Sequence, residues 1–133
     1  SEAVAQTVKP GEHGTTFGGA PMACAAVEAT LDIIVDEGLI EKARVVGETL
    51  AGALGQLPGV VEVRGSGAWI GVVLDRPAGA VKDALLARGF LVGTASDPHV
   101  LRLAPPAVMP PWVCCELAET LGEVLVQAAM VAA

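Results

Sequence analysis

A stretch of small and hydroxyl-bearing residues precedes the first predicted helix. Residues 13–21 read His-Gly-Thr-Thr-Phe-Gly-Gly-Ala-Pro, so Thr15 and Thr16 lie among glycines, just before a proline suited to a first helical turn. Glycines let a backbone approach an anion closely, a helix N-terminus favours negative charge, and a threonine hydroxyl can donate to a phosphate oxygen. The stretch is a candidate phosphate contact, although its spacing is equally compatible with a plain turn.

A single arginine interrupts an apolar run near the end of the chain. Residues 100–103 read Val-Leu-Arg-Leu, which is typical of a strand, and the arginine is Arg102. A guanidinium presents two parallel donors to a carboxylate, which a lysine cannot do. Arg102 is therefore a candidate carboxylate contact. On its own, however, it is better explained by an ordinary ion pair at a strand end.

Other chemistry has less support. His13 and His99 stand apart from cysteines and carboxylates at ligand spacing, so we predict no metal site. The lysines are Lys9, Lys42 and Lys82, and they fall in a loop or on the polar sides of predicted helices. Each is explained as a solvated charge, and we assign none of them a catalytic role.

Composition limits the partners of the chain. It has 133 residues and a net charge of −7, and no apolar run approaches the roughly 20 residues of a membrane span. We predict no membrane partner, and no nucleic-acid partner, because displacing counterions needs clustered Lys and Arg. The first residues lack the basic start and apolar core of a secretory signal, and three cysteines do not make a disulfide framework. We expect a cytoplasmic protein with reduced thiols.

The hydrophobic pattern predicts an α+β fold in which helices cover a small sheet. Short segments rich in β-branched residues, separated by turn residues, are the first two expected strands, whereas apolar residues recur at helical spacing in the expected helices. The expected order is helix 21–38, helix 39–55, strands 60–64 and 69–74, helix 78–88, strands 90–92 and 100–103, and helix 113–131.

Three motifs, taken in order, resemble those of the class III aminotransferases. They are the loop at 13–21, the Leu-Pro-Gly-Val-Val-Glu-Val-Arg-Gly-Ser-Gly stretch at 57–67, and the Val-Leu-Arg-Leu-Ala-Pro-Pro stretch at 100–106. The resemblance extends from Lys9 to about Gln127, and within the class it is strongest to the acetylornithine aminotransferases. It implies a pyridoxal-phosphate-dependent transferase of fold type I, of which this chain is the C-terminal portion.

The resemblance also implies roles for individual residues. Thr16 is expected to donate to the phosphate of pyridoxal phosphate across a dimer interface, and Thr15 to meet the substrate beside it. Arg102 matches the arginine that grips the α-carboxylate of the amino acid or keto acid. The Schiff-base lysine lies upstream in relatives, so this chain contains no catalytic residue and is expected to be inactive alone.

Domain limits follow from the same resemblance. Residues 1–22 are expected to end the large cofactor domain, 23–38 to form a linking helix, and 39–133 to form the small C-terminal domain. The expected function is amino transfer between N-acetylornithine, or a related ω-amino compound, and 2-oxoglutarate, in arginine biosynthesis. The expected partners are a small-molecule substrate and a second copy or the missing upstream half. A non-catalytic dimerisation or binding module derived from a truncated enzyme is the alternative.

Some positions depart from the family pattern. Relatives carry Asn at Ala20, a polar residue at Gly93, and a capping Thr with acidic residues within 109–115. Because a missing cap weakens a helix start by roughly 1 kcal/mol, the start of the closing helix is left open. The exact substrate is also left open.

Overall fold

The computed structural model describes residues 1–132, which form two compact units. The first unit is Ser1–Glu37 and the second begins at Gly38. Each unit has its own elements and is described separately. Within the described residues, no helix combines the length and the apolar character needed to cross a membrane.

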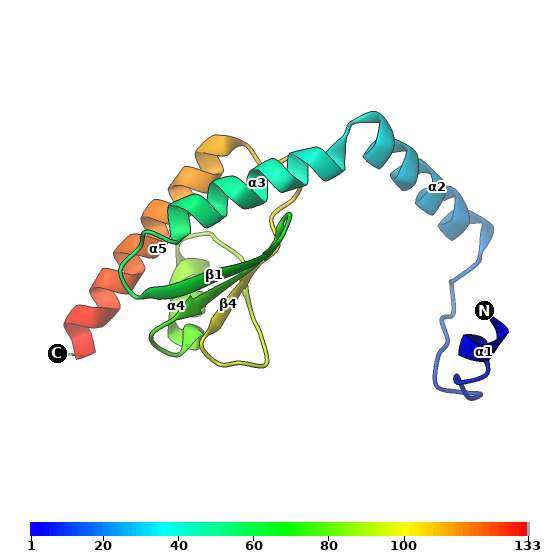
Figure 1. Cartoon of the computed structure of the whole chain (residues 1–133), viewed down its shortest axis with the longest axis horizontal. Helices are drawn as coiled ribbons and strands as arrows, with labels where there is room; N and C mark the ends of the chain where they lie inside the picture. The colour runs from blue at the N-terminus through cyan, green and yellow to red at the C-terminus, as the bar shows by residue number, and fades with distance from the viewer. Residues whose placement is uncertain (133) are drawn as a thin grey trace. The chain divides into compact units, whose positions relative to one another are not determined.

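The first unit consists of two helices joined by a long loop. Helix α1 (Glu2–Ala5) is a single turn, and α2 (Pro21–Asp36) has the proline at its first position, as the sequence predicts. Figure 1 shows the extended loop between these helices. None of the residues of α2 is buried, and Met22, Val27, Leu31 and Val35 are all exposed. The apolar stripe of α2 thus has no partner within this unit.

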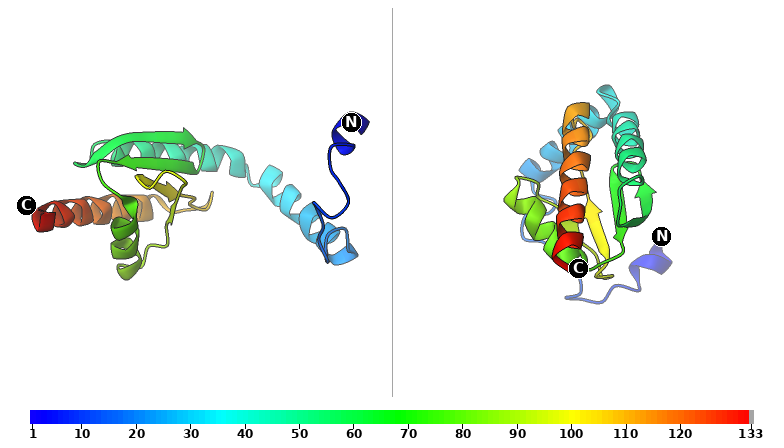
Figure 2. Two further views of the ribbon diagram at one scale, coloured as in Figure 1. Left: turned by 90° about the horizontal axis from the view of Figure 1, so that it is seen from below. Right: turned by 90° about the vertical axis from the view of Figure 1, so that its left-hand side faces the viewer.

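The second unit is built on a four-stranded antiparallel sheet. Its strands are β1 (Val60–Ser66), β2 (Trp69–Leu74), β3 (Gly93–Thr94) and β4 (Val100–Leu103), in the spatial order β1-β2-β4-β3. Three helices pack with this sheet, namely α3 (Leu39–Leu54), α4 (Ala78–Ala87) and α5 (Pro111–Ala132). Figures 1 and 2 show α3 and α5 side by side. The predicted α+β fold is confirmed.

Alternation along β2 sorts its side chains between the two faces of the sheet. Ile70, Val72 and Leu74 are buried, whereas Trp69 on the opposite face is 61% exposed. The buried residues meet apolar side chains from all three helices, so one face of the sheet forms the core. The members of this core that are least exposed include Leu50, Leu54, Val72, Leu85, Leu101 and Leu121.

Helix α3 is amphipathic for reasons visible in its sequence. Val46, Leu50 and Leu54 recur every four residues and are buried. Arg44, on the solvent side, donates hydrogen bonds to the carboxylates of Glu41 and Glu48, at i−3 and i+4. The same helix therefore contributes to the core on one side and is stabilised by exposed ion pairs on the other.

Two boundaries differ from the sequence prediction. A strand was expected at 90–92, but these residues have no strand structure. The short strand β3 lies just after them, because Gly93 and Thr94 are the residues that pair with Arg102 and Leu101. Phe90 still packs against the core, which explains its apolar character. Helix α5 begins at Pro111, two residues before the predicted start, since proline tolerates a first helical turn.

A close backbone approach joins α3 to the turn between β1 and β2. A methyl group placed at Gly47 would collide with the carbonyl oxygen of Gly67. Gly67 also has a φ of 54°, in the region that favours glycine. The hairpin and helix therefore approach one another more closely than any side chain at Gly47 would permit.

This approach yields a stability prediction. Gly47→Ala should lower the free energy of unfolding by roughly 1–3 kcal/mol, because the added methyl group forces the helix and the hairpin apart. Gly52→Ala is the matched control: it lies on the same helix with open space around it, and should raise stability by up to about 1 kcal/mol through helix propensity. Urea unfolding followed by circular dichroism measures both. Equal stability of the two variants would contradict the close packing.

The exposed stripe of α2 yields a prediction about association. Because isolated apolar patches of this kind drive self-association, we expect the 133-residue chain to form oligomers as its concentration rises. Replacing Leu31 by Glu should shift the chain toward monomer, whereas Asp32→Asn, next to it, should not. Sedimentation velocity over a concentration series measures this. A monomer at every concentration would be evidence against an exposed apolar surface that drives association.

Candidate functional site

The glycine-threonine loop lies in the first unit, immediately before α2. The Thr15 hydroxyl oxygen accepts a hydrogen bond from the Gly18 backbone N–H at 3.2 Å, and the Ala20 N–H donates to the Phe17 carbonyl oxygen. Thr15 therefore stabilises a local turn. Thr16 is exposed, and within the described chain its hydroxyl has no hydrogen-bond partner. The structure thus contains the turn that the sequence left open, together with an available hydroxyl before a helix.

Arg102 lies on β4, on the face of the sheet opposite the core. Its neighbours Leu101 and Leu103 are buried, so alternation turns Arg102 outward, and its side chain is exposed. Its guanidinium lies over the indole of Trp69, with 5.3 Å between the guanidinium carbon and the ring centroid. Among the described residues, no carboxylate pairs with Arg102. The strand-end ion pair that Arg102 on its own would suggest is therefore not present among the described residues.

Strand register places glycine on both sides of Arg102. Gly71 on β2 and Gly93 on β3 are its direct cross-strand partners, and Gly71 also pairs with Arg64 on β1. Because glycine has no side chain, neither of these two cross-strand positions covers the Arg102 guanidinium with a side chain. Arg64 lies 3.6 Å from Glu62, so its charge is partly balanced, unlike that of Arg102.

Trp69 was not predicted as a site residue. No aromatic residue was expected beside Arg102, and Trp69, which is 61% exposed, is not part of the core of this chain. Its diagonal contact with Arg102 depends on the pairing of β2 with β4, which are separated in the chain by α4 and β3. No local sequence signal identifies such a pair.

The lysines come from three different elements. Lys9 is exposed in the loop of the first unit, Lys42 lies on α3, and Lys82 on α4 is 3.2 Å from a carboxylate oxygen of Asp83. Lys9 lies in the same loop as Thr16, seven residues before it, whereas Lys42 and Lys82 share no element with Thr16 or Arg102. Lys9 and Lys42 lie at exposed positions, as expected, whereas Lys82 is half-buried and ion-paired.

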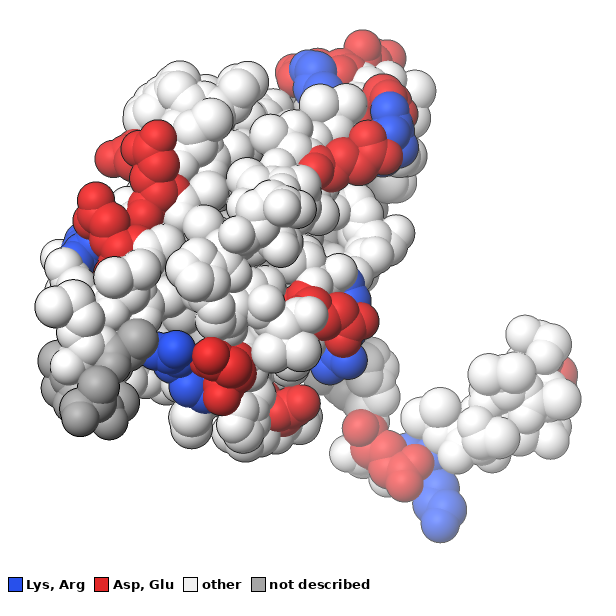
Figure 3. Space-filling view, turned by 60° about the vertical axis from the view of Figure 1, so that its left-hand side comes forward, with Lys and Arg blue, Asp and Glu red and all other residues white. Residues whose placement is uncertain are grey.

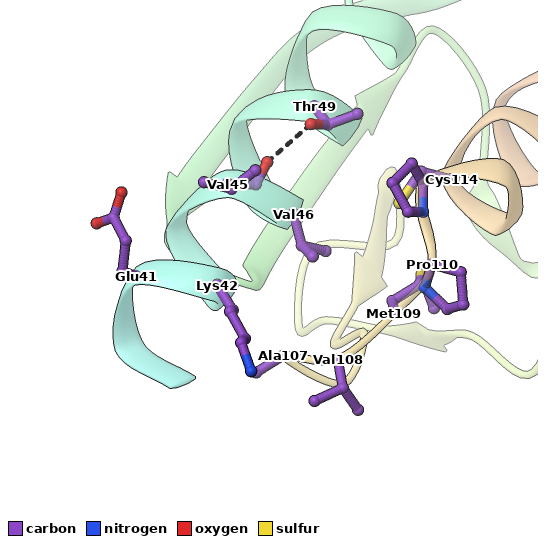
Figure 4. Close-up of a pocket in the computed structure, with 11 residues that line it drawn as sticks. Glu41, Lys42, Val45, Val46, Thr49, Ala107, Val108, Met109, Pro110 and Cys114 are labelled. Atoms are coloured by element: carbon purple, nitrogen blue, oxygen red, sulfur yellow. Dashed lines mark hydrogen bonds between the residues drawn. The ribbon is translucent and has the colours of Figure 1, made fainter. Parts of the chain in front are cut away.

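A groove of about 420 Å³ opens between α3 and the segment that leads into α5. Figure 4 shows Val46 and Cys114 on its inner side, with Lys42 and Glu41 on α3 at the outer end. Burial raises the pKa of the Cys114 thiol, so this sulfur is a packing group rather than a nucleophile. Apart from Thr49, whose hydroxyl donates to the carbonyl oxygen of Val45, the remaining lining is apolar.

Charged side chains occur in small mixed groups. Figure 3 shows basic residues beside acidic ones on the face it presents, with uncharged surface between them. Arg88, for example, lies 2.7 Å from Glu123, and Arg76 lies 2.6 Å from Asp75. No group of three or more His, Cys, Asp or Glu residues among those described has the arrangement of a metal site.

Comparison with known proteins places these features in one family. A model of the Aminotransferase class-III family matches residues 1–125. The acetylornithine aminotransferase of Streptomyces coelicolor is 48% identical over 104 residues, which cover 76% of this chain and 26% of that protein. The ornithine aminotransferase of Bordetella pertussis is 41% identical over 132 residues, covering 92% of this chain and 31% of that protein.

Solved structures agree with the sequence relatives. The acetylornithine aminotransferase of Elizabethkingia anophelis superposes with a TM-score of 0.73 at 27% identity, covering 96% of this chain and 35% of that one. The ornithine aminotransferase of Toxoplasma gondii gives a TM-score of 0.74 at 28% identity, covering 96% and 32%. The chain thus spans roughly a quarter to a third of the length of these relatives. It belongs to the class III aminotransferases, a family of pyridoxal-phosphate-dependent enzymes.

Proposed function

We propose that this chain is the C-terminal part of an aminotransferase that moves an amino group between N-acetylornithine, or a related ω-amino compound, and 2-oxoglutarate in arginine biosynthesis. The observation that carries the proposal is Arg102: an exposed guanidinium without an acidic partner in the described chain, set between two glycines. Both substrates present a carboxylate, and a guanidinium binds a carboxylate through two parallel hydrogen bonds. Relatives named for acetylornithine support the choice of amino donor.

The loop before α2 fits the phosphate of pyridoxal phosphate. An available Thr16 hydroxyl and a helix N-terminus are the donors that a phosphate prefers, and Gly18 and Gly19 permit close approach. When bound, the cofactor supplies an electron sink that lets an amino group leave one carbon skeleton and join another. Thr16 would hold the phosphate, Thr15 would meet the substrate, and Arg102 would orient the α-carboxylate.

The chain does not carry the whole reaction. The lysine that attaches the cofactor belongs to a segment upstream of the loop in the family pattern, and we propose that this chain alone is inactive. Residues 1–22 would complete the large domain, 23–38 would link the domains, and 39–133 would form the small domain of a cytoplasmic homodimer. The boundary of the compact units at Gly38 supports the proposed start of the small domain.

A chimera tests the proposal. We would replace the corresponding segment of the Streptomyces coelicolor acetylornithine aminotransferase by this chain, and assay transfer from N-acetylornithine to 2-oxoglutarate. The chimera should transaminate, whereas Arg102→Gln should lower kcat/KM by about 100-fold, because a pair of charge-assisted hydrogen bonds is lost. Arg64→Gln is the matched control, since Arg64 is exposed on the same sheet and paired with Glu62. It should change kcat/KM by less than about twofold.

The outcomes separate the proposed function from the alternative. A chimera that folds and retains pyridoxal phosphate on dialysis, but does not transaminate, would support a non-catalytic module. An active chimera in which Arg102→Gln and Arg64→Gln behave alike would leave the family reaction intact and remove Arg102 from it. The unmodified parent enzyme, taken through the same preparation, provides the reference rate.

A further inference from the structure

The surroundings of Arg102 restrict where its guanidinium can lie. Trp69 approaches it from β2 and Gly93 from β3, the two strands that flank β4. A cation at this distance from an indole is attracted to the face of the ring. A long exposed side chain would otherwise sample many rotamers, so a contact on each side removes much of that freedom. The guanidinium is held before any ligand arrives.

Gly93 contributes by having no side chain. A carbon added at Gly93 would lie 3.0 Å from the Nη2 atom of Arg102, 3.2 Å from Nε and 3.4 Å from Cζ. A side chain at residue 93 would therefore be in tight contact with three guanidinium atoms, and the guanidinium would have to move by a few tenths of an ångström. Because even alanine would press on the group, glycine at this site favours the observed position of the guanidinium.

The remaining donors of Arg102 are available to a ligand. The guanidinium carbon of Arg102 lies over the indole ring, and within the described residues no carboxylate binds the guanidinium N–H groups. A planar, oriented and unneutralised guanidinium is suited to a planar anion that accepts two parallel hydrogen bonds. A carboxylate has this shape.

We propose that Trp69 is a positioning residue for Arg102, and that Trp69 and Gly93 together preset the guanidinium to bind a substrate carboxylate. This inference rests on the proposed function, because it takes Arg102 as the carboxylate contact. It adds a role for two residues that do not touch the reacting atoms. Since Trp69 contacts the guanidinium directly, its fluorescence should also report when a carboxylate is bound.

The first test uses the 133-residue chain without catalysis. The sequence contains two tryptophans, so Trp112→Phe leaves Trp69 as the single reporter. Titration with glutarate, a dicarboxylate that cannot transaminate, should change the Trp69 emission saturably, and sodium chloride at matched ionic strength should not. Arg102→Gln in the same background should abolish the saturable change. No response to glutarate, or an equal response in the Arg102→Gln chain, overturns the proposal.

The second test separates positioning from a structural role. In the chimera, Trp69→Leu should raise the KM for 2-oxoglutarate by about 3- to 10-fold with kcat within about twofold, because the lost contact orients bound substrate without acting in the chemical step. Trp69→Phe should restore part of the KM, since a phenyl ring keeps a weaker cation contact. Trp112→Phe should leave both constants unchanged.

Gly93 provides an independent variant that adds atoms. Gly93→Ala should raise the same KM by at least about 3-fold, because the methyl group displaces the guanidinium. Gly79→Ala, at an exposed position of α4 with open space around it, is the control and should leave KM unchanged. If Trp69→Leu and Gly93→Ala leave KM unchanged while Arg102→Gln lowers kcat/KM, the positioning proposal fails and the proposed function stands. If Arg102→Gln also has no effect, the carboxylate role of Arg102 fails as well.

Discussion

The second unit depends on burial of one face of its two central strands. Ile70 and Val72 on β2 and Leu101 and Leu103 on β4 pack against α3, α4 and α5, and each side chain of this size contributes about 1.5–3 kcal/mol when it leaves water. Because side chains alternate along a strand, burying these four commits the residues between them to the other face. Arg102 and Trp69 are exposed together as a direct consequence.

Burial of only apolar side chains in the core leaves the candidate binding groups on the surface of the chain. Among the described residues no polar or charged residue is buried, so the core is purely apolar. The candidate contacts are instead exposed groups with fixed backbones beneath them: a guanidinium on a paired strand and a hydroxyl just before a sixteen-residue helix. They lie in different compact units. Each would therefore serve a site completed by other parts of an enzyme.

Much of the fold follows from local patterns in the sequence. Period-two alternation from Trp69 to Leu74 and the four-residue recurrence of Val46, Leu50 and Leu54 predict β2 and α3 directly. The strand predicted at 90–92 was wrong, because Phe90 and Val92 pack on the core without strand pairing and Leu91 is exposed. The strand β3 forms instead where Gly93 and Thr94 pair with β4. Apolar character indicates burial, but it does not distinguish a paired segment from an unpaired one.

The candidate site was predictable only in part, for a related reason. Residue type identified Arg102 and Thr16, and the order of motifs related them to a family. The contact of Arg102 with Trp69 and the space left by Gly93 arise from the register among β2, β4 and β3, which short-range patterns do not specify. Interactions between strands distant in the chain had to come from the structure.

The central claim is that the Arg102 guanidinium is a preset carboxylate contact. The most direct measurement is a crystal structure of the chimeric enzyme with glutarate bound. We expect a glutarate carboxylate to accept two hydrogen bonds from Arg102, with the guanidinium still over the Trp69 ring and against Gly93. Glutarate bound elsewhere in the active site, with Arg102 paired to a carboxylate of the protein, would contradict it.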